Sequence, residues 1–478
     1  MKTRTAAEVA RLTSAQLVGV PDVLVGPDVT IDSREVQPGS LFVALPGERV
    51  HGADYIAAAA AAGATAALTT RPVDAALSQL VVEDVTVALA ELARNLVAEA
   101  RRDGLITLAL TGSTGKTSTK DLLAQILADE GPTIAPPNSY NNEIGVPLTA
   151  CQIEEGTRYL VSEMGTRGAG HIRWLCQIVP PHIAAVLGVG TAHLGELGSV
   201  EAIAEAKAEI LAGLGPEDWA VLNADDHLVA AMGENLPAKI AWFSGAGLLR
   251  LGDLAVRAED LQPTPLQQYA FDLVVTRDNT ESRYRVQLRQ LGAHHVQNAC
   301  AAAAMALAAG LDAGEIARSL GAATERSHWR MHPHLLANGA ALINDAYNAN
   351  PDSMAAALHA LAEIGKGRRV ETPSARTIAV LGDMAELGEQ AGALHAQIGD
   401  LAGRLGVDEV IAVGEHAADL VRAARRAGIV ARCEEVATVA ESVLLRPGDV
   451  VLVKASRVFA FEDVAQQLIE RSGGEVTA

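Results

Sequence analysis

The sequence is poor in aromatic residues and in cysteine. Phenylalanine, tryptophan and tyrosine make up 3% of the 478 residues, although hydrophobic residues as a whole make up 49%. Alanine-rich helices, expected over residues 56–67 and 299–309, supply much of that apolar content. The four cysteines are scattered, at Cys151, Cys176, Cys300 and Cys433. Their spacing excludes a disulfide framework and a cysteine metal site.

Long apolar runs and an excess of positive charge are also missing. No stretch of about 18 apolar residues predicts a membrane span, and the opening segment MKTRTAAEVARLTSAQL is typical of an amphipathic helix rather than a signal peptide. With 38 Lys and Arg against 58 Asp and Glu, the net charge is −20, which argues against nucleic-acid binding by bulk attraction. We therefore expect a soluble cytoplasmic protein in which any anion site is local.

The length predicts more than one domain, because 478 residues exceed the size of one ordinary core. Short β-like runs and an alanine-rich helix occupy residues 1–85. Apolar strands alternate with helical segments over residues 86–318, except that residues 250–290 alternate like antiparallel strands. Strand and helix alternate again over residues 319–478. Because such alternation is typical of parallel sheets, we predict an α/β protein with these three domains.

The stretch TGSTGKTSTK (111–120) follows an apolar run and precedes a helical segment. Its glycines permit a tight turn whose N–H groups point inward, and the helix N-terminus adds partial positive charge. A lysine and a threonine there suit the β- and γ-phosphates and magnesium. A glycine-rich structural turn is the alternative, but the order of strand, loop and helix favours a nucleotide site. The predicted ATP-binding residues are Gly112, Ser113, Thr114, Gly115, Lys116, Thr117 and Ser118.

The short glycine spacing, G-x-x-G-K-T, resembles the Mur ligases, which add amino acids to a UDP-linked peptidoglycan precursor, and their folylpolyglutamate synthetase relatives. Further motifs follow in family order: NNEIGVPLT (141–149), SEMGTRGAGHI (162–172), GVGTAHLGELGS (188–199), AKAEI (206–210), LNADD (222–226), GAHHVQNACAA (292–302), NDAYNANP (344–351), LGDMAELG (381–388) and VLVKASR (451–457). The resemblance implies a UDP-substrate domain, a central P-loop ATPase-like domain and a Rossmann-like domain for the incoming amino substrate.

The resemblance also implies ATP and Mg²⁺ as cofactors, because a substrate carboxylate must approach a triphosphate and both are anions. The implied metal ligands are Thr117, Glu163, His193 and Lys207, and the implied catalytic residues are Lys116, Lys207 and His193. Lys207 is implied to carry a carbamate, which turns a cation into an anionic ligand. The residues alone favour a solvated Lys207 paired with a glutamate one helical turn away, and they leave structural roles open for Glu163 and His193.

Other residues take implied roles from the motifs that they match. Asn298 would contact adenine, Arg330 the phosphates and Asp345 the ribose of ATP. The implied contacts of the UDP-substrate are Ser33 and Arg34. The implied contacts of the amino substrate are Asn348, Asn350, Lys454, Ser456 and Arg457.

Three positions depart from the family pattern. Trp329 stands where glycine usually precedes Arg-Met, and Ala455 stands where glycine more often precedes Ser-Arg. His51 replaces the usual aspartate before a glycine of the first domain. These changes bear on the backbone near Arg330 and on the edge of the UDP site.

NDAYNANP together with LGDMAELG, and the lack of a DNPR motif, resembles members that add D-alanyl-D-alanine to UDP-N-acetylmuramoyl-tripeptide. The resemblance thus implies a monomeric ATP-dependent amide ligase with those two molecules as substrates. The alternative is the adjacent ligase, which adds diaminopimelate or lysine to the UDP-linked dipeptide. A dinucleotide-binding or regulatory protein is disfavoured, because the final α/β segment lacks G-x-G-x-x-G.

Overall fold

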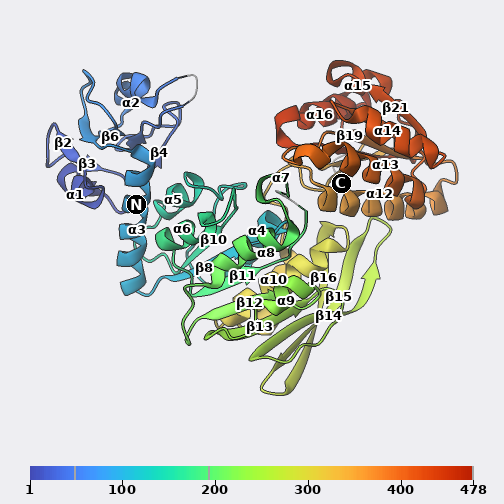
Figure 1. Cartoon of the computed structure of the whole chain (residues 1–478), viewed down its shortest axis with the longest axis horizontal. Helices are drawn as coiled ribbons and strands as arrows, with labels where there is room; N and C mark the ends of the chain where they lie inside the picture. The colour runs from blue at the N-terminus through green and yellow to red at the C-terminus, as the bar shows by residue number, and fades with distance from the viewer. Residues whose placement is uncertain (48–49, 192–193, 476–478) are drawn as a thin grey trace.

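A strand-rich N-terminal segment and two stretches of alternating strands and helices give three α/β domains, as predicted. The structure, a computed structural model, describes residues 1–47, 50–191 and 194–475. Figure 1 shows the N-terminal domain (blue) and the C-terminal domain (orange to red) at opposite ends of the central domain. Among the described residues, no helix combines the length and apolar character that crossing a membrane requires.

The N-terminal domain is a five-stranded sheet of order β2-β7-β6-β5-β4, parallel except between β2 and β7. Its strands are β2 (Gln16–Val18), β4 (Val29–Thr30), β5 (Leu41–Val43), β6 (Ala66–Thr69) and β7 (Ser78–Val81), beside the pair β1 (Arg4–Thr5) and β3 (Leu24–Val25). Its helices are α1 (Ala6–Leu12), η1 (Gly52–Tyr55) and α2 (Ile56–Ala62). The helix predicted over residues 56–67 begins at Ile56 as expected but is shorter, because Gly63 ends α2 with φ +110 and a strand follows.

The central domain is a nine-stranded sheet of order β16-β15-β14-β13-β12-β11-β8-β10-β9, parallel from β9 to β14. Its strands are β8 (Ile106–Thr111), β9 (Thr133–Ile134), β10 (Tyr159–Glu163), β11 (Ile183–Val186), β12 (Trp219–Asn223), β13 (Lys239–Ser244), β14 (Leu254–Pro263), β15 (Gln268–Arg277) and β16 (Thr280–Leu291). The last three pair antiparallel, which confirms the pattern predicted for residues 250–290.

Helices cover both faces of the central sheet. They are α3 (Val85–Arg102), α4 (Lys116–Glu130), α5 (Gly145–Ala150), α6 (His171–Ile178), α7 (Leu194–Leu197), α8 (Val200–Ala208), η2 (Glu209–Leu211), α9 (His227–Ala231), α10 (His294–Ala308) and α11 (Ala313–Ala322). Along β8, Leu108 and Leu110 pack with α4 and α10, whereas Ala109 packs with α3 on the opposite face. The alanines of α10 are buried against the sheet, which explains how a core so poor in aromatic residues is filled.

The C-terminal domain is a six-stranded sheet of order β17-β18-β22-β19-β20-β21, parallel except between β17 and β18. Its strands are β17 (His332–Leu335), β18 (Ala341–Asn344), β19 (Thr377–Gly382), β20 (Glu409–Val413), β21 (Val430–Glu434) and β22 (Val450–Lys454). Its helices are α12 (Pro351–Glu371), η3 (Gly388–Gln390), α13 (Ala391–Leu405), α14 (Ala417–Arg426), α15 (Val436–Ser442), η4 (Arg457–Phe459) and α16 (Phe461–Arg471). Ala379 and Leu381 of β19 pack with α12 to α14, and Ile378 and Val380 pack with α15 and α16.

Candidate functional site

A cavity of about 680 Å³ lies between the central and C-terminal domains, where the carboxyl ends of β8, β10, β18 and β22 lead into loops. It is lined by the predicted residues Ser113, Thr114, Gly115, Lys116, Thr117, Ser118, Glu163, Asn298, Arg330, Asp345, Asn348, Asn350, Lys454, Ser456 and Arg457. Gly112, Lys207, Ser33 and Arg34 do not line it, and His193 lies outside the described residues. The fold therefore brings most of the predicted site together from two domains.

The phosphate loop joins β8 to α4 and has no room for side chains at its two glycines. Gly115 has φ +79, and a Cβ atom there would lie 2.5 Å from Asn298 Oδ1. A Cβ atom on Gly112 would lie 2.9 Å from Leu187 Cβ. Lys116 begins α4, and its Nζ donates to Gly112 O at 2.7 Å. The loop thus has the geometry that an anion site at a helix N-terminus needs.

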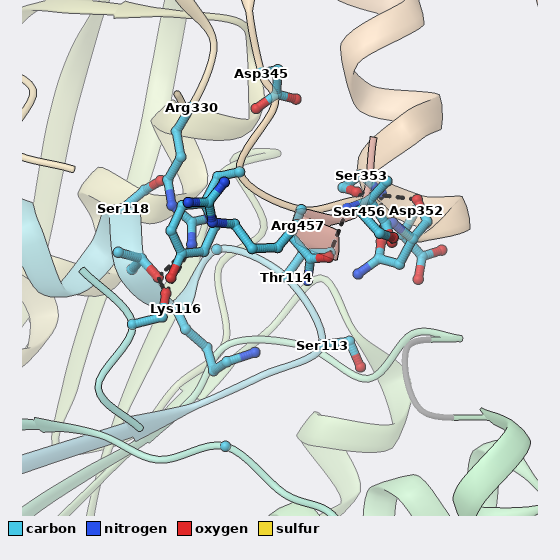
Figure 2. A pocket seen from close by; sticks show the side chains of 18 of the residues that line it. Ser113, Thr114, Lys116, Ser118, Arg330, Asp345, Asp352, Ser353, Ser456 and Arg457 are labelled. Carbon is cyan, nitrogen blue, oxygen red and sulfur yellow. Dashed lines mark hydrogen bonds between the residues drawn. The ribbon is translucent and has the colours of Figure 1, made fainter. Parts of the chain in front are cut away.

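Arg330 reaches from the C-terminal domain to this loop. Its Nη2 donates to Thr117 Oγ1 and to Ser139 Oγ, both at 2.9 Å, and the two hydroxyl oxygens are 2.7 Å apart. Its guanidinium also lies 4.1 Å from the centre of the Tyr347 ring. The pKa of Lys116 is lowered, mainly because the side chain is buried. The nearby Glu163 carboxylate opposes this shift, and the charge of Arg330 adds to it. Figure 2 shows Arg330 and Lys116 on the same side of the pocket.

Glu163 ends β10 with 1% of its surface exposed. Its Oε1 accepts from Asn141 Nδ2 at 2.8 Å, whereas Oε2 has no hydrogen-bond partner in the part of the chain that is described. A buried carboxylate oxygen without a donor is costly, and a hard divalent cation would satisfy it. Within the described residues, no three His, Cys, Asp or Glu side chains converge on one point, so protein groups alone do not complete a cation site. Glu163 Oε2 and the Thr117 hydroxyl are therefore the oxygen groups that would hold a magnesium ion here.

Lys207 lies on α8 with 1% of its surface exposed. No hydrogen bond or ion pair joins it to any residue that the structure describes. Burial, and after it the charge of Lys116, lowers the pKa of Lys207 well below its ordinary value. The solvated lysine that the residues alone favoured is therefore wrong, and the neutral amine is stabilised.

The first turns of α10 place three polar side chains at the cavity. Asn298 is buried, and its Nδ2 has no hydrogen-bond partner among the described residues. The rings of His294 and His295 lie 4.3 Å apart. Burial lowers the pKa of His294 to about 4 and that of His295 well below its ordinary value. These neutral rings and the free amide can serve polar groups of a nucleotide without adding charge.

Asp345 and Lys454 form a buried ion pair. Lys454 Nζ lies 2.6 Å from Asp345 Oδ2 and also donates to Asn348 O at 2.8 Å. Asp345 Oδ1 accepts from Met331 N at 3.1 Å. The two side chains are predicted to contact different substrates, but in this structure they bind each other.

Asn350, Ser456 and Arg457 also have partners within the C-terminal domain. Asn350 caps α12, since its Oδ1 accepts from Ser353 N at 2.8 Å. Ser456 Oγ accepts from Ala385 N at 2.8 Å and donates to Ala349 O, and Arg457 pairs with Glu462. These contacts fix the loops at the cavity, and binding of an amino substrate by these residues stays a prediction.

The three departures from the family pattern have structural counterparts. Trp329 takes φ +60, the left-handed conformation that glycine adopts without strain, and its ring lies 4.8 Å from the Arg457 guanidinium carbon. Ala455 is fully buried, and a Cβ atom on Gly382 would lie 2.6 Å from its methyl group, so Gly382 makes room for it. His51 Nδ1 accepts from Ala53 N at 3.1 Å.

Ser33 and Arg34 follow β4 in the N-terminal domain. The guanidinium of Arg34 turns back onto Asp32, with Nε 2.9 Å from Oδ1, and this contact lowers the pKa of Asp32 to about 2. Arg34 is thus engaged locally in this structure, and contact with a uridine diphosphate stays a prediction.

The cavity is also lined by side chains to which the sequence prediction assigned no role, among them Ser139, Asn141, His294, His295, Tyr347 and Asp352. The adjacent His294 and His295 at the start of an alanine-rich helix were a detectable signal. Nothing in the local pattern marks Ser139 or Asp352, because their importance comes from contacts between domains.

Family models match three parts of the chain. "Mur ligase family, catalytic domain" matches residues 28–109, "Mur ligase middle domain" residues 110–306, and "Mur ligase, glutamate ligase domain" residues 329–457. Together they cover most of the three domains.

Named relatives and solved structures match nearly the whole chain. The UDP-N-acetylmuramoyl-tripeptide--D-alanyl-D-alanine ligase of Mycobacterium tuberculosis is 40% identical over 92% of each chain. The protein of that name from Escherichia coli is 34% identical over 92% of this chain and 93% of its own. MurF from Acinetobacter baumannii superimposes with a TM-score of 0.84 at 30% identity, covering 98% of this chain and 99% of its own. MurF ligase from Thermotoga maritima in complex with ADP gives 0.73 at 26% identity, covering 92% and 96%.

Replacing Lys116 by alanine should weaken the binding of ADP and MgATP at least about tenfold, because a hydrogen bond to a charged group contributes about 1.5–3 kcal/mol. Isothermal titration measures the dissociation constants. Lys239→Ala is the matched control, since Lys239 lies in the same domain and pairs with exposed Glu217 at 3.0 Å. Equal nucleotide affinities in the two variants would contradict the phosphate-loop assignment.

Proposed function

The chain belongs to the Mur ligase family, and we propose that it joins D-alanyl-D-alanine to the terminal carboxylate of UDP-N-acetylmuramoyl-tripeptide. As a Mur ligase it is an ATP-dependent enzyme that forms a carbon–nitrogen bond. The observation that carries the proposal is the cavity in which a phosphate loop from one domain meets Arg330 and Lys454 from another. The end-to-end match with relatives named for this reaction supports the choice of substrates.

The proposed reaction has two steps. An oxygen of the tripeptide's terminal carboxylate attacks the γ-phosphorus of ATP, the bond to the β-phosphate oxygen breaks, and an acyl phosphate and ADP form. The amine of D-alanyl-D-alanine then attacks the carbonyl carbon, phosphate leaves and the amine loses a proton. Lys116 and Arg330 stabilise charge on the phosphoryl oxygens, and the two domains hold the reactants together.

Magnesium suits this site because Glu163 Oε2 has no hydrogen-bond donor among the described residues and Thr117 offers a hydroxyl. These two residues would hold the ion, with His193, outside the described residues, as the further expected ligand. When bound, the cation supplies the charge that lets carboxylate and triphosphate approach each other.

The alternative within the family is addition of diaminopimelate or lysine to the UDP-linked dipeptide. The relatives above are named for D-alanyl-D-alanine addition, which favours the first reaction. The other interpretation of the sequence, a dinucleotide-binding or regulatory protein, is disfavoured because the chain belongs to the Mur ligase family.

With MgATP and UDP-N-acetylmuramoyl-tripeptide, the purified protein should release phosphate at least about tenfold faster with D-alanyl-D-alanine than with D-alanine, lysine or diaminopimelate. A site built for a dipeptide leaves its buried polar groups unpaired when a single amino acid binds. Phosphate release and product mass measure this preference. Comparable turnover of lysine or diaminopimelate on the UDP-linked dipeptide would assign the protein to the alternative reaction.

We also propose that Lys207 carries a carbamate. Three lysines are almost fully buried, Lys120, Lys207 and Lys454. Lys120 donates to Pro136 O at 2.8 Å and pairs with Asp121, and Lys454 pairs with Asp345. Lys207 alone of these three has no hydrogen bond or ion pair with the described residues, and its lowered pKa favours the neutral amine that captures carbon dioxide. The resulting anion would face the charge of Lys116 and could serve a second cation.

Carbon-13 bicarbonate should therefore give a carbamate carbon signal in the wild-type protein that Lys207→Ala loses. Lys120→Met is the matched control, because it removes a buried lysine that already has partners and should keep the signal. Stripping carbon dioxide at alkaline pH should lower activity, bicarbonate should restore it, and a small carboxylate should partly rescue Lys207→Ala. An unlabelled Lys207 together with full activity of Lys207→Ala would exclude the carbamate.

Three further expectations stay predictions. They are the domain boundaries at residues 85 and 318, the monomeric state and the cytoplasmic location. Sedimentation with and without substrates would measure the oligomeric state directly.

A further inference from the structure

The segment that follows β11, residues 187–191, is held from outside at each of its residues. Two of its carbonyl oxygens accept hydrogen bonds: Leu187 O from Asn223 Nδ2 at 2.8 Å and Gly188 O from Ser113 N at 3.0 Å. Its next three N–H groups donate: Val189 N to Asp226 Oδ2 at 2.7 Å, Gly190 N to Ser113 Oγ at 2.8 Å and Thr191 N to Asp352 Oδ2 at 2.8 Å. The first four partners belong to the central domain, and Asp352 belongs to the C-terminal domain. The set of hydrogen bonds that holds residues 187–191 therefore includes a contact from the C-terminal domain.

The contact with Asp352 is close and specific. Thr191 offers its hydroxyl as well as its N–H, with Oγ1 3.2 Å from Asp352 Oδ2. A Cβ atom on Gly190 would lie 2.2 Å from the same oxygen, so only glycine leaves room for the carboxylate there. Asp352 lies in the first turn of α12, where a negative charge is favoured by the helix dipole.

Asp352 lies between the phosphate loop and the start of α12, and hydrogen bonds or chain neighbours link it to both. Thr191 and Gly190 are adjacent, and Gly190 N donates to Ser113 of the phosphate loop. On its other side, Asp352 belongs to the same helix start as Asn350, a predicted amino-substrate contact. Figure 2 shows Asp352 and Ser353 at this helix start and Ser113 on the phosphate loop below.

We propose that Asp352 is a positioning residue that couples docking of the C-terminal domain to the phosphate loop, acting through Thr191 and Gly190. This inference rests on the proposed ligase function. The phosphate loop belongs to the central domain, so nucleotide can still bind there when Asp352 is replaced, but without the contacts of Arg330 and Asp345 from the C-terminal domain. Capture of the amine and passage to product require the docked arrangement, which Asp352 stabilises relative to the undocked one.

Asp352→Ala should lower kcat/KM for D-alanyl-D-alanine roughly tenfold or more, because the loss of a charged acceptor depopulates the docked state. Its dissociation constant for MgATP should rise by a smaller factor than kcat/KM falls, because the phosphate loop remains and only the contacts of Arg330 and Asp345 are weakened. Asp352→Asn keeps one acceptor oxygen and should give an intermediate value. Thermal unfolding of each variant verifies that it is folded.

Gly190→Ala supplies the decisive comparison, since its methyl group collides with Asp352. Alone it should lower kcat/KM about as much as Asp352→Ala. In the Asp352→Ala background it should cost clearly less than it does alone, because the colliding carboxylate is gone and only Ser113 Cβ, at 3.3 Å, must shift by a few tenths of an ångström. Additive losses, or a loss of MgATP affinity as large as the loss in kcat/KM, would overturn the proposal.

Small-angle scattering separates this inference from the function on which it rests. In MgATP the wild-type protein should be more compact than Asp352→Ala and Gly190→Ala. If wild-type protein made no product from the two substrates, the ligase proposal would fail, and the scattering would still decide the docking role. Equal radii of gyration for wild type and both variants would overturn that role.

Discussion

The hydrogen bonds from Arg330 to Thr117 and Ser139 are the contact on which the cavity depends. A chain with a net charge of −20 cannot attract a triphosphate by bulk charge, so its cations must be placed locally. The central domain contributes Lys116, and the C-terminal domain contributes Arg330. Because each domain holds only part of the polar lining, the relative position of the domains determines whether the site is complete.

The Thr117 hydroxyl can serve both domains at once. A hydroxyl has one donor and two acceptor positions. If its proton points to Ser139, one lone pair accepts from Arg330 and the other is left for a cation beside Glu163. Metal binding and docking of the C-terminal domain are therefore compatible at this oxygen.

Local pattern was enough to predict the phosphate loop, since strand, glycines, lysine and helix follow one another between Ile106 and Glu130. It also predicted the antiparallel strands after residue 250. It was insufficient for Lys207, because helical periodicity does not show which neighbours remove solvent from a lysine. The left-handed Trp329 and the contact of Asp352 with Thr191 depend on tertiary packing, which no sequence spacing encodes.

In the proposed reaction, the cavity transfers the γ-phosphoryl group of ATP to the acceptor carboxylate before the amide forms. The direct measurement uses UDP-N-acetylmuramoyl-tripeptide with oxygen-18 in its terminal carboxylate and follows released phosphate by phosphorus-31 NMR. The bridging oxygen of the acyl phosphate leaves with phosphorus, so each turnover should release phosphate that carries one oxygen-18 atom. Unlabelled phosphate accompanying labelled amide product would contradict the account.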